Sequence, residues 1–600
     1  MKQAGYSIGV LSAVLGLGFV ASGTGGCSDE RDGFAPPNAG FLTDAGSEAA
    51  APEECFQQCS LDGRAVIDSC TGEALEQCAD DQACGAAKCQ EPCAAAEAAR
   101  SSNGCNFYFA MHRYEQTWPQ SCYAAFVVNT SNQPATLTLE RKGEKLDISN
   151  AVFRAVSNST ELEHLEGAIP PGESAILFLS DWDRGKARTV GEKAYHIGCP
   201  YGTKPAIEAD FGTFNSAIGD AFRLASDVPV GLTSMYPYGG AASFIPSATL
   251  VFPVSAWAKE HVVVNGWEAT YGNPMTQIYA SEDDTEVTLI GKVNVGNGSG
   301  FKGAAAGDPM TIRLQKGQFA QIVQTAELTG SLVFSNKPTI TLGGNTCAFL
   351  PHQAGACDTL AQQIPPFEQW GTEYAGVGYR PRTAGEDELI WYRLVAARDG
   401  TELDYEPVKP AGAPLTMAAG ELALFRARAS EPFIIRSRDA EHPFYLGAHM
   451  SGGGGDPNFG IPTFGGMGDP DFVNVVPTGQ YMSSYSFYAD STYPEHSLVI
   501  VRKKTRGEFK DVWLECAGNL PDFRPIDTAG QYEYTRVDLS RLFRPGDKFG
   551  DKQCRTGLQR MKSEGPFAAT LWGWGSYASY GYPGGLANRK LVGFSLSGVN

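Results

Sequence analysis

Positive charge and histidine are scarce in this 600-residue sequence. Lys and Arg number 47 against 67 Asp and Glu, which gives a formal net charge of −20, and there are 8 His. So acidic a chain is poorly suited to a phosphate backbone, which excludes nucleic acid as the main partner. No two His have the spacing of an H-E-x-x-H or H-x₃-H metal site, and no pair of C-x₂-C motifs suggests zinc.

Catalytic motifs are missing as well. Beyond the first few residues no G-x-S-x-G elbow occurs, and no G-x-x-x-x-G-K-[ST] loop is present anywhere. These absences argue against serine hydrolases and P-loop enzymes, and we expect a protein that is not an enzyme. Paired carboxylates for sugar hydrolysis need no fixed spacing in the sequence. An exported carbohydrate-active hydrolase therefore stays open as an alternative.

Residues 1–27 have the features of an export signal. A single Lys precedes an apolar stretch over about 8–21, and small residues lead from there to Cys27. This arrangement predicts a signal peptide rather than a membrane-spanning helix. The two glycines before Cys27 resemble the bacterial lipoprotein box, in which the Cys becomes the lipid-modified first residue. Because Thr24 stands where that box usually has Leu, ordinary cleavage after Gly23 stays open.

The next segment, 28–54, is acidic and rich in Ala, Gly and Pro. It has too few large apolar side chains to offset the entropy of folding, so we predict a disordered tether.

Cysteine usage predicts disulfides. Of the 15 Cys, 14 remain when Cys27 is set aside, an even number suited to pairing in an oxidising compartment. Residues 55–100 hold seven of them, two pairs of which are spaced i, i+4 as on one face of a helix. We therefore predict a small disulfide-stapled helical segment at 55–100. Because seven is odd, one of these sulfurs is expected to pair with Cys105.

From about residue 105 onward, short β-branched and aromatic runs alternate with Gly, Pro, Asp and Asn, which predicts strands and turns. Two central segments align: QIYASEDDTEVTL (277–289) with YRLVAARDGTELDY (392–405), each a β-hairpin with acidic turn residues. Weaker copies flank them. A glycine recurs in the middle element of three copies, where we expect a turn with positive φ: Gly172, Gly317 and Gly420.

These repeats predict an all-β fold with about four tandem units, near 105–243, 244–362, 363–470 and 471–595. Units of this size suit β-sandwiches packed together. A β-propeller-like ring of sheets is the alternative, because it also explains recurrence and hides strand edges.

The order of the elements resembles a known family: bacterial proteins that carry the domain found at the N-terminus of the IgGFc-binding protein. The resemblance spans roughly 105–595 and is carried by IPPFEQWGTEYAGVGY (364–379), YRLVAARDGTEL (392–403), AAGELALF (418–425), SNKP (335–338) and SYGYPGG (579–585). It implies an extracellular binding or adhesion module. No family site can be matched residue by residue, so Fc binding itself is not carried over.

Two segments offer candidate sites. The run WGWGSYASYGYPGG (572–585) concentrates aromatic residues that could anchor a ligand, and a half-buried core strand is the alternative. The residues concerned are Trp572, Trp574, Tyr577, Tyr580 and Tyr582. The glycine-rich loop 451–472 offers three carboxylates as possible Ca²⁺ ligands without EF-hand spacing, and a flexible loop between units is the alternative. These are Asp456, Asp469 and Asp471.

Together these features predict a surface-anchored adhesion protein that recognises a glycan or a protein ligand. We expect it at the bacterial cell envelope, in the outer membrane or at the cell surface, held by a lipid on Cys27. No cofactor is expected apart from a possible structural Ca²⁺. A structural envelope or matrix protein is a further alternative.

Overall fold

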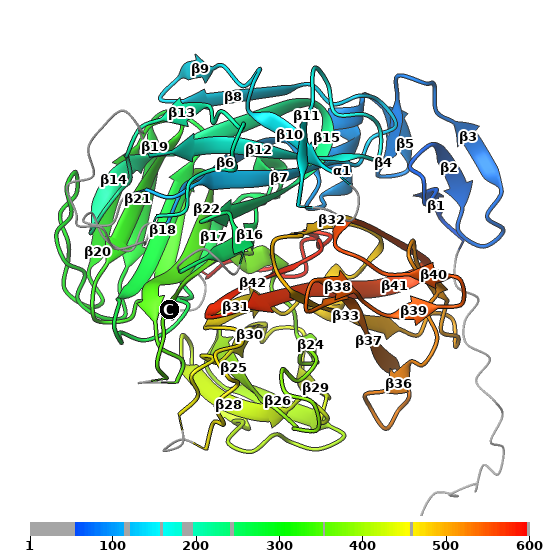
Figure 1. Ribbon diagram of the computed structural model, residues 1–600. Helices are drawn as coiled ribbons and strands as arrows, with labels where there is room; N and C mark the ends of the chain where they lie inside the picture. Colours follow the sequence, from blue (N-terminus) through cyan, green and yellow to red (C-terminus); the bar gives the residue numbers. More distant parts are fainter. Residues whose placement is uncertain are drawn as a thin grey trace, which may run out of the picture. The chain divides into compact units, whose positions relative to one another are not determined.

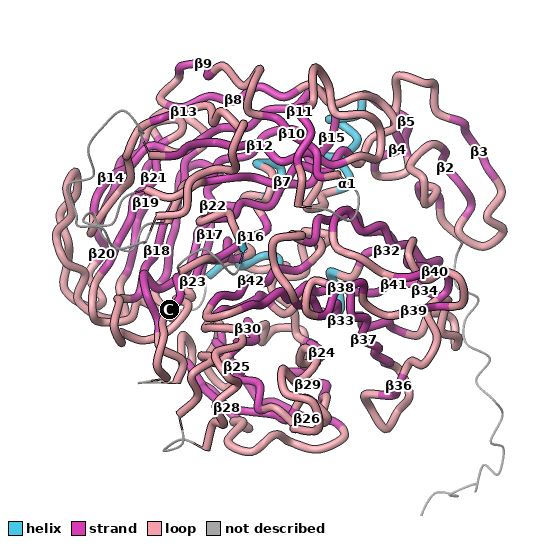
Figure 2. The backbone as a smooth tube through the Cα atoms, in the orientation of Figure 1, coloured by secondary structure: helices cyan, strands magenta, loops and turns pink. Residues whose placement is uncertain are grey.

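The computed structural model describes residues 55–112, 120–156, 160–182, 196–240, 245–351, 354–456 and 460–596. The predicted export signal with Cys27 and the predicted tether lie outside these ranges. Strands dominate the described residues, and α1 (Pro92–Ala99) is the α-helix among them (Figures 1 and 2). The predicted all-β class is therefore confirmed. In the same ranges no helix has the length and apolar character that crossing a membrane would require.

The cysteine-rich segment differs from its prediction. Its one helix is α1, whereas residues 57–90 form β1 (Gln57–Cys59), β2 (Ala65–Asp68), β3 (Ala74–Gln77), β4 (Ala83–Gly85) and β5 (Lys88–Gln90). Cys55 and Cys59 do not share a helix face, because no helix forms there. Cys55 bonds to Cys70, and Cys59 of β1 bonds to Cys84 of β4. Short runs separated by turn residues favour such hairpins over a helix. The expected bond from this segment to Cys105 is present and starts at Cys93.

All 14 cysteines from residue 55 onward are paired, as the even count predicts. The seven disulfides are Cys55–Cys70, Cys59–Cys84, Cys78–Cys89, Cys93–Cys105, Cys122–Cys199, Cys347–Cys357 and Cys516–Cys554.

One strand-pairing scheme recurs four times along the chain. In each set three strands pair antiparallel with a later strand, usually a long one, and a final strand returns along it. The first set is β6 (Gly104–Phe109), β7 (Tyr123–Asn129), β8 (Leu137–Arg141), long β15 (Phe222–Tyr236) and returning β16 (Ser247–Leu250). The second is β17 (Ala258–Val262), β18 (Pro274–Ala280), β19 (Thr285–Ile290), long β22 (Leu332–Ala348) and returning β23 (Asp358–Ile364).

The other two sets follow the same order. The third is β24 (Glu373–Gly376), β25 (Leu389–Ala396), β26 (Thr401–Glu406), a later strand split into β29 (Phe433–Ser437) and β30 (Phe444–Met450), and returning β31 (Asp471–Asn474). The fourth is β32 (Met482–Ala489), β33 (Glu495–Lys503), β34 (Val512–Leu514), long β41 (Gly557–Gly575) and returning β42 (Ala578–Pro583). The four sets follow one another along the chain in the same order as the four predicted units.

The third set is a β-sandwich. Its strands form two four-stranded sheets, β24-β29-β26-β27 and β28-β25-β30-β31, with β27 (Thr416–Met417) and β28 (Leu422–Arg428) at their edges. Residues of both sheets share one core, for example Leu403 and Phe433 with Leu394 and Leu446. The later strand splits where it passes from one sheet to the other, so its two halves cover the two faces of this core.

The four returning strands meet at the centre of the described fold (Figures 1 and 2). They contact one another in a closed cycle, β16 with β23, β23 with β31, β31 with β42 and β42 with β16. Polar side chains cross this centre: Gln362 donates to the carbonyls of Ala248 and Gly581, at 2.8 and 2.9 Å. The units therefore combine sandwich-type packing with a ring-like arrangement.

Short 3₁₀ turns link one unit to the next. They are η2 (Val254–Ala256), η3 (Phe367–Gln369) and η5 (Thr478–Gln480), each preceded by a proline that fixes the backbone before the turn. The indole N–H of Trp370 donates to the carbonyl five residues earlier, as does that of Trp257. The Gln480 amide donates to the Gln369 carbonyl, and the Gln369 amide to the carbonyl of Ala256. The linkers are thus hydrogen-bonded to one another in a chain.

Candidate ligand-binding site

The acidic hairpin residues have a structural role. The Asp283 carboxylate accepts the N–H of Lys316, and the Asp399 carboxylate accepts the N–H of Ala419, at 3.0 and 2.8 Å. In both copies the donor immediately precedes a glycine with positive φ. Each Asp therefore connects its hairpin turn to the neighbouring turn by a hydrogen bond. This structural role explains why an acidic residue occurs at the same place in two repeats, and no catalytic role is needed to explain it.

The aromatic run at 572–585 is mostly core. The side chains of Trp572, Trp574, Tyr580 and Tyr582 are buried, and only Tyr577, 50% exposed, is available to a ligand. The core-strand alternative therefore describes the run, and these four rings form no binding surface. The ring of Tyr379, from the third set, packs against both indoles, with ring centroids 4.9 and 5.9 Å apart.

Glycine in this run serves packing. A Cβ built on Gly573 would lie 2.2 Å from the ring of Tyr580, its partner across the β41–β42 ladder. The small residues let an aromatic ring lie flat on the neighbouring strand, so aromatics and glycines alternate for the sake of the core.

The three carboxylates predicted as Ca²⁺ ligands are buried, and they do not converge on one point. Within the ranges that the structure describes, the group of three side-chain ligands close enough to share an ion is Cys55, Asp68 and Cys70, whose sulfurs are bonded to each other. Asp469 and Asp471 instead neighbour Asp358, at the start of β23, which sequence patterns did not single out. Asp456 forms a β-bridge with Ile461.

Burial disfavours the charged form of each of these central acids. Burial raises the pKa of Asp469 to about 7 and raises the pKa of Asp471 well above its ordinary value. Burial, and then the charges of Asp469 and Asp471, raise the pKa of Asp358 well above its ordinary value. The Ser579 amide donates to Asp358 at 3.3 Å, and the Asp469 amide donates to the Ser579 hydroxyl at 2.8 Å. The cluster joins β23, β42 and the end of the glycine-rich loop.

A buried histidine of the fourth set offers no activated nucleophile. His496 Nδ1 lies 2.7 Å from the Ser540 hydroxyl, and its Nε2 lies 2.8 Å from the Tyr580 hydroxyl. The Ser540 hydroxyl donates its proton to the Pro494 carbonyl, so it accepts from the imidazole. Burial lowers the pKa of His496 to about 3, which keeps the ring neutral. These hydrogen bonds of His496 connect strands β33, β37 (Tyr532–Arg541) and β42 of the sheet.

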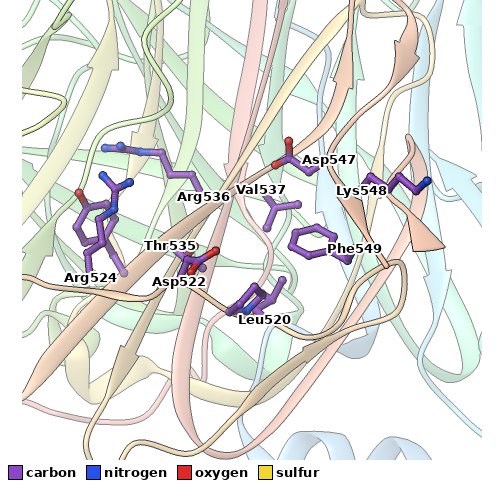
Figure 3. A pocket seen from close by; sticks show the side chains of 11 residues that line it. Leu520, Asp522, Arg524, Thr535, Arg536, Val537, Asp547, Lys548 and Phe549 are labelled. Atoms are coloured by element: carbon purple, nitrogen blue, oxygen red, sulfur yellow. The ribbon is translucent and has the colours of Figure 1, made fainter. Parts of the chain in front are cut away.

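An open hollow of about 340 Å³ is lined by residues from 520–549, a segment between β34 and β41 of the fourth set in the sequence, and we take it as the candidate site (Figure 3). It is built on β37 (Tyr532–Arg541), which pairs with β33, together with β36 (Arg524–Pro525) and β39 (Lys548–Phe549). Its lining consists of Leu520, Pro521, Asp522, Arg524, Tyr534, Thr535, Arg536, Val537, Asp547, Lys548 and Phe549.

Charges of both signs line this hollow. Arg524 and Arg536 lie at one end and Asp547 and Lys548 at the other, with Asp522 between them (Figure 3). No ion-pair partner for the Arg524 guanidinium occurs within the described ranges. Such a lining can hydrogen-bond a polar ligand at several points, with Phe549 as an apolar wall.

Two of the charged groups are fixed. The Arg536 guanidinium donates to the carbonyls of Gly378 and Ala429, at 2.9 and 2.6 Å, and burial lowers its pKa. The Asp547 carboxylate accepts the N–H of Asp538 at 2.8 Å, and burial raises its pKa. The site is thus preorganised at these two residues. Sequence patterns missed it, because its residues come from separate strands and turns and form no motif.

Comparison with known proteins shows that the hollow lies within a segment that matches a protein family. A family model described as IgGFc binding protein matches residues 247–573, from β16 into β41, and this range includes the whole lining of the hollow. The chain is also 29% identical over 270 residues to the IgGFc-binding protein of Homo sapiens. That alignment covers 44% of this chain but 4% of the human protein, so the chain corresponds to a small part of that relative.

Proposed function

This chain belongs to the IgGFc-binding protein family, whose model covers more than half of it, and on that premise we propose that it is an exported adhesion protein. Its ligand is a protein or a glycan, bound at the hollow of β36, β37 and β39. Family membership is the observation that carries this proposal. Seven disulfides support export, because such bonds persist in oxidising compartments.

The proposed location is the bacterial cell surface, with Cys27 as the lipid attachment point and 28–54 as the tether. The sequence before Cys27 supports this part of the proposal. Metabolic labelling with a fatty acid would test it: the wild type is expected to carry the label and Cys27→Ala to lose it. A labelled Cys27→Ala, or an unlabelled wild type, would contradict lipidation at this residue.

Ligand binding is tested with the full mature chain on a glycan array and a panel of surface proteins. We expect at least one ligand, and we expect Arg524→Gln combined with Lys548→Gln to weaken it at least tenfold. Both side chains are exposed on the rim of the hollow, so these substitutions should leave the fold intact.

Arg313→Gln is the matched control, because it removes one guanidinium that is 80% exposed in the second unit. It should bind like the wild type. Absence of any ligand would contradict the adhesion function, and a ligand that the double variant binds at full strength would move the site away from this hollow.

A further inference from the structure

A second hollow, of about 130 Å³, lies at the other end of β37. Its lining is Thr160, Ser491, Tyr493, Leu539, Ser540, Phe543, Arg544, Pro545, Arg555 and Thr556. We propose that this hollow is a separate binding site that takes an anionic sugar, one carrying a carboxylate or a sulfate. The proposal goes beyond the function proposed above, because it concerns other residues and names the ligand's chemistry.

The first observation is unbalanced positive charge. Arg544 and Arg555 both line the hollow and are exposed. Neither guanidinium has a carboxylate or a hydrogen-bond acceptor among the residues that the structure describes, although the chain carries a net charge of −20. By contrast, neighbouring Arg541 is paired with Asp538. Two unpaired guanidiniums beside one hollow favour an anionic group, which Arg can hold with two parallel hydrogen bonds.

The second observation is a strained backbone turn that places an exposed aromatic ring, that of Phe543, beside the hollow. Leu542 and Phe543 are the two residues of the turn between β37 and β38 (Arg544–Pro545), and both have positive φ, 51° and 61°. Asn and Gly usually occupy such a turn, because Cβ disfavours left-handed backbone: Gly has no Cβ, and the short side chain of Asn can hydrogen-bond to the local backbone. Leu542 and Phe543 are nevertheless 69% and 63% exposed. Packing therefore does not explain why these two residues stand here.

The surrounding structure holds the strained turn in place. The Phe543 amide donates to the Pro494 carbonyl at 3.0 Å, and the Leu542 amide donates to the Glu495 carboxylate at 2.8 Å. Glu495 is itself fixed by an ion pair of 2.6 Å with Arg380. Strained backbone that is held by its neighbours and displays side chains to solvent is typical of functional sites.

The combination of groups fits a charged sugar better than a bare anion. An exposed aromatic ring can stack against the apolar face of a sugar, and the hydroxyls of Ser491 and Thr556 lie in the same lining. The two guanidiniums then face the carboxylate or sulfate. A neutral sugar would leave them unused, and an inorganic ion would leave the ring unused.

Isothermal titration of the full mature chain at low salt tests the proposal. The probes are glucuronic acid, galactose 6-sulfate, galactose and inorganic sulfate. We expect both anionic sugars to bind, galactose to bind at least tenfold more weakly, and sulfate to bind more weakly than galactose 6-sulfate. Arg544→Gln and Arg555→Gln should each weaken the anionic sugars at least tenfold, and Phe543→Ala should weaken the sugars but not sulfate.

Controls separate this site from the first hollow and from misfolding. Arg313→Gln should bind the anionic sugars like the wild type. Every variant should keep the wild-type unfolding temperature to within the small shift expected from replacing one exposed side chain. The proposal is overturned if neither anionic sugar binds, if galactose or sulfate binds equally well, or if both Arg variants retain full affinity. Loss of binding in Arg524→Gln alone would assign the sugar to the first hollow.

Discussion

Replacing Leu542 and Phe543 together by Asn and Gly should stabilise the β37–β38 hairpin. Left-handed backbone costs an L-residue about 1–2 kcal/mol, so two such residues cost about 2–4 kcal/mol, most of which Asn-Gly avoids. The side chains are 69% and 63% exposed, so about a third of each is buried. Removing that third costs about 1–2 kcal/mol in all, and the greater freedom of unfolded Gly costs about 0.4–1 kcal/mol. The expected net gain is about 1 kcal/mol.

Native-state hydrogen exchange of the amides in β37 and β38 measures this gain locally. A gain of about 1 kcal/mol should slow their exchange about fivefold when they exchange by local opening. The matched control is Leu542→Ala with Phe543→Ala, which removes the same side chains but keeps two L-residues in left-handed backbone. This control should exchange faster than the wild type. Faster exchange in the Asn-Gly variant would refute the claim that the turn is strained.

Three further perturbations have defined outcomes. Burial raises the pKa of Asp469 from 3.8 to about 7. Between these two pH values the folded state binds one more proton than the unfolded state, so the free energy of unfolding falls as pH rises from about 4 to 7. Asp469→Asn should flatten that part of the pH profile of the unfolding temperature, and an unchanged profile would contradict the raised pKa. Arg382→Met should lower the free energy of unfolding by about 3–5 kcal/mol, because it leaves Glu388 buried without its ion-pair partner. Adding Glu388→Gln should recover much of this loss, as measured by urea unfolding. No recovery in the double variant would contradict the importance of the Arg382–Glu388 pair. Replacing Cys122 and Cys199 by Ser opens a loop with a sequence separation of 77 and should cost about 4 kcal/mol by chain entropy; calorimetry showing an unchanged unfolding temperature would argue against this.

Backbone turns were predictable from sequence where they need a residue that tolerates positive φ, because few residue types do so. The three glycines expected in turns, Gly172, Gly317 and Gly420, have φ of 68°, 79° and 65°. The acidic hairpin turns also formed as predicted, with Asp284 at φ 51° and Gly400 at φ 69°. These positions are set by local conformational preference, which a short stretch of sequence contains.

Features that depend on distant contacts were not predictable. The aromatic run at 572–585 has the same composition whether its rings are exposed or buried. Trp572 and Trp574 are buried partly against Tyr379, which lies about 190 residues away in the sequence, so a short stretch of sequence does not contain this contact. Asp358 joins Asp469 and Asp471 only because the returning strands meet at the centre of the fold. The candidate hollow likewise depends on strands and turns brought together by the sheet, and no motif marks its residues.

The most direct test of the central claim, that the fourth unit binds the ligand, is hydrogen exchange of the full mature chain with and without the ligand found by screening. Protection is expected within 520–549, around Arg524 and Lys548. Ligand-dependent protection confined to the other three units, with none in this range, would contradict the account.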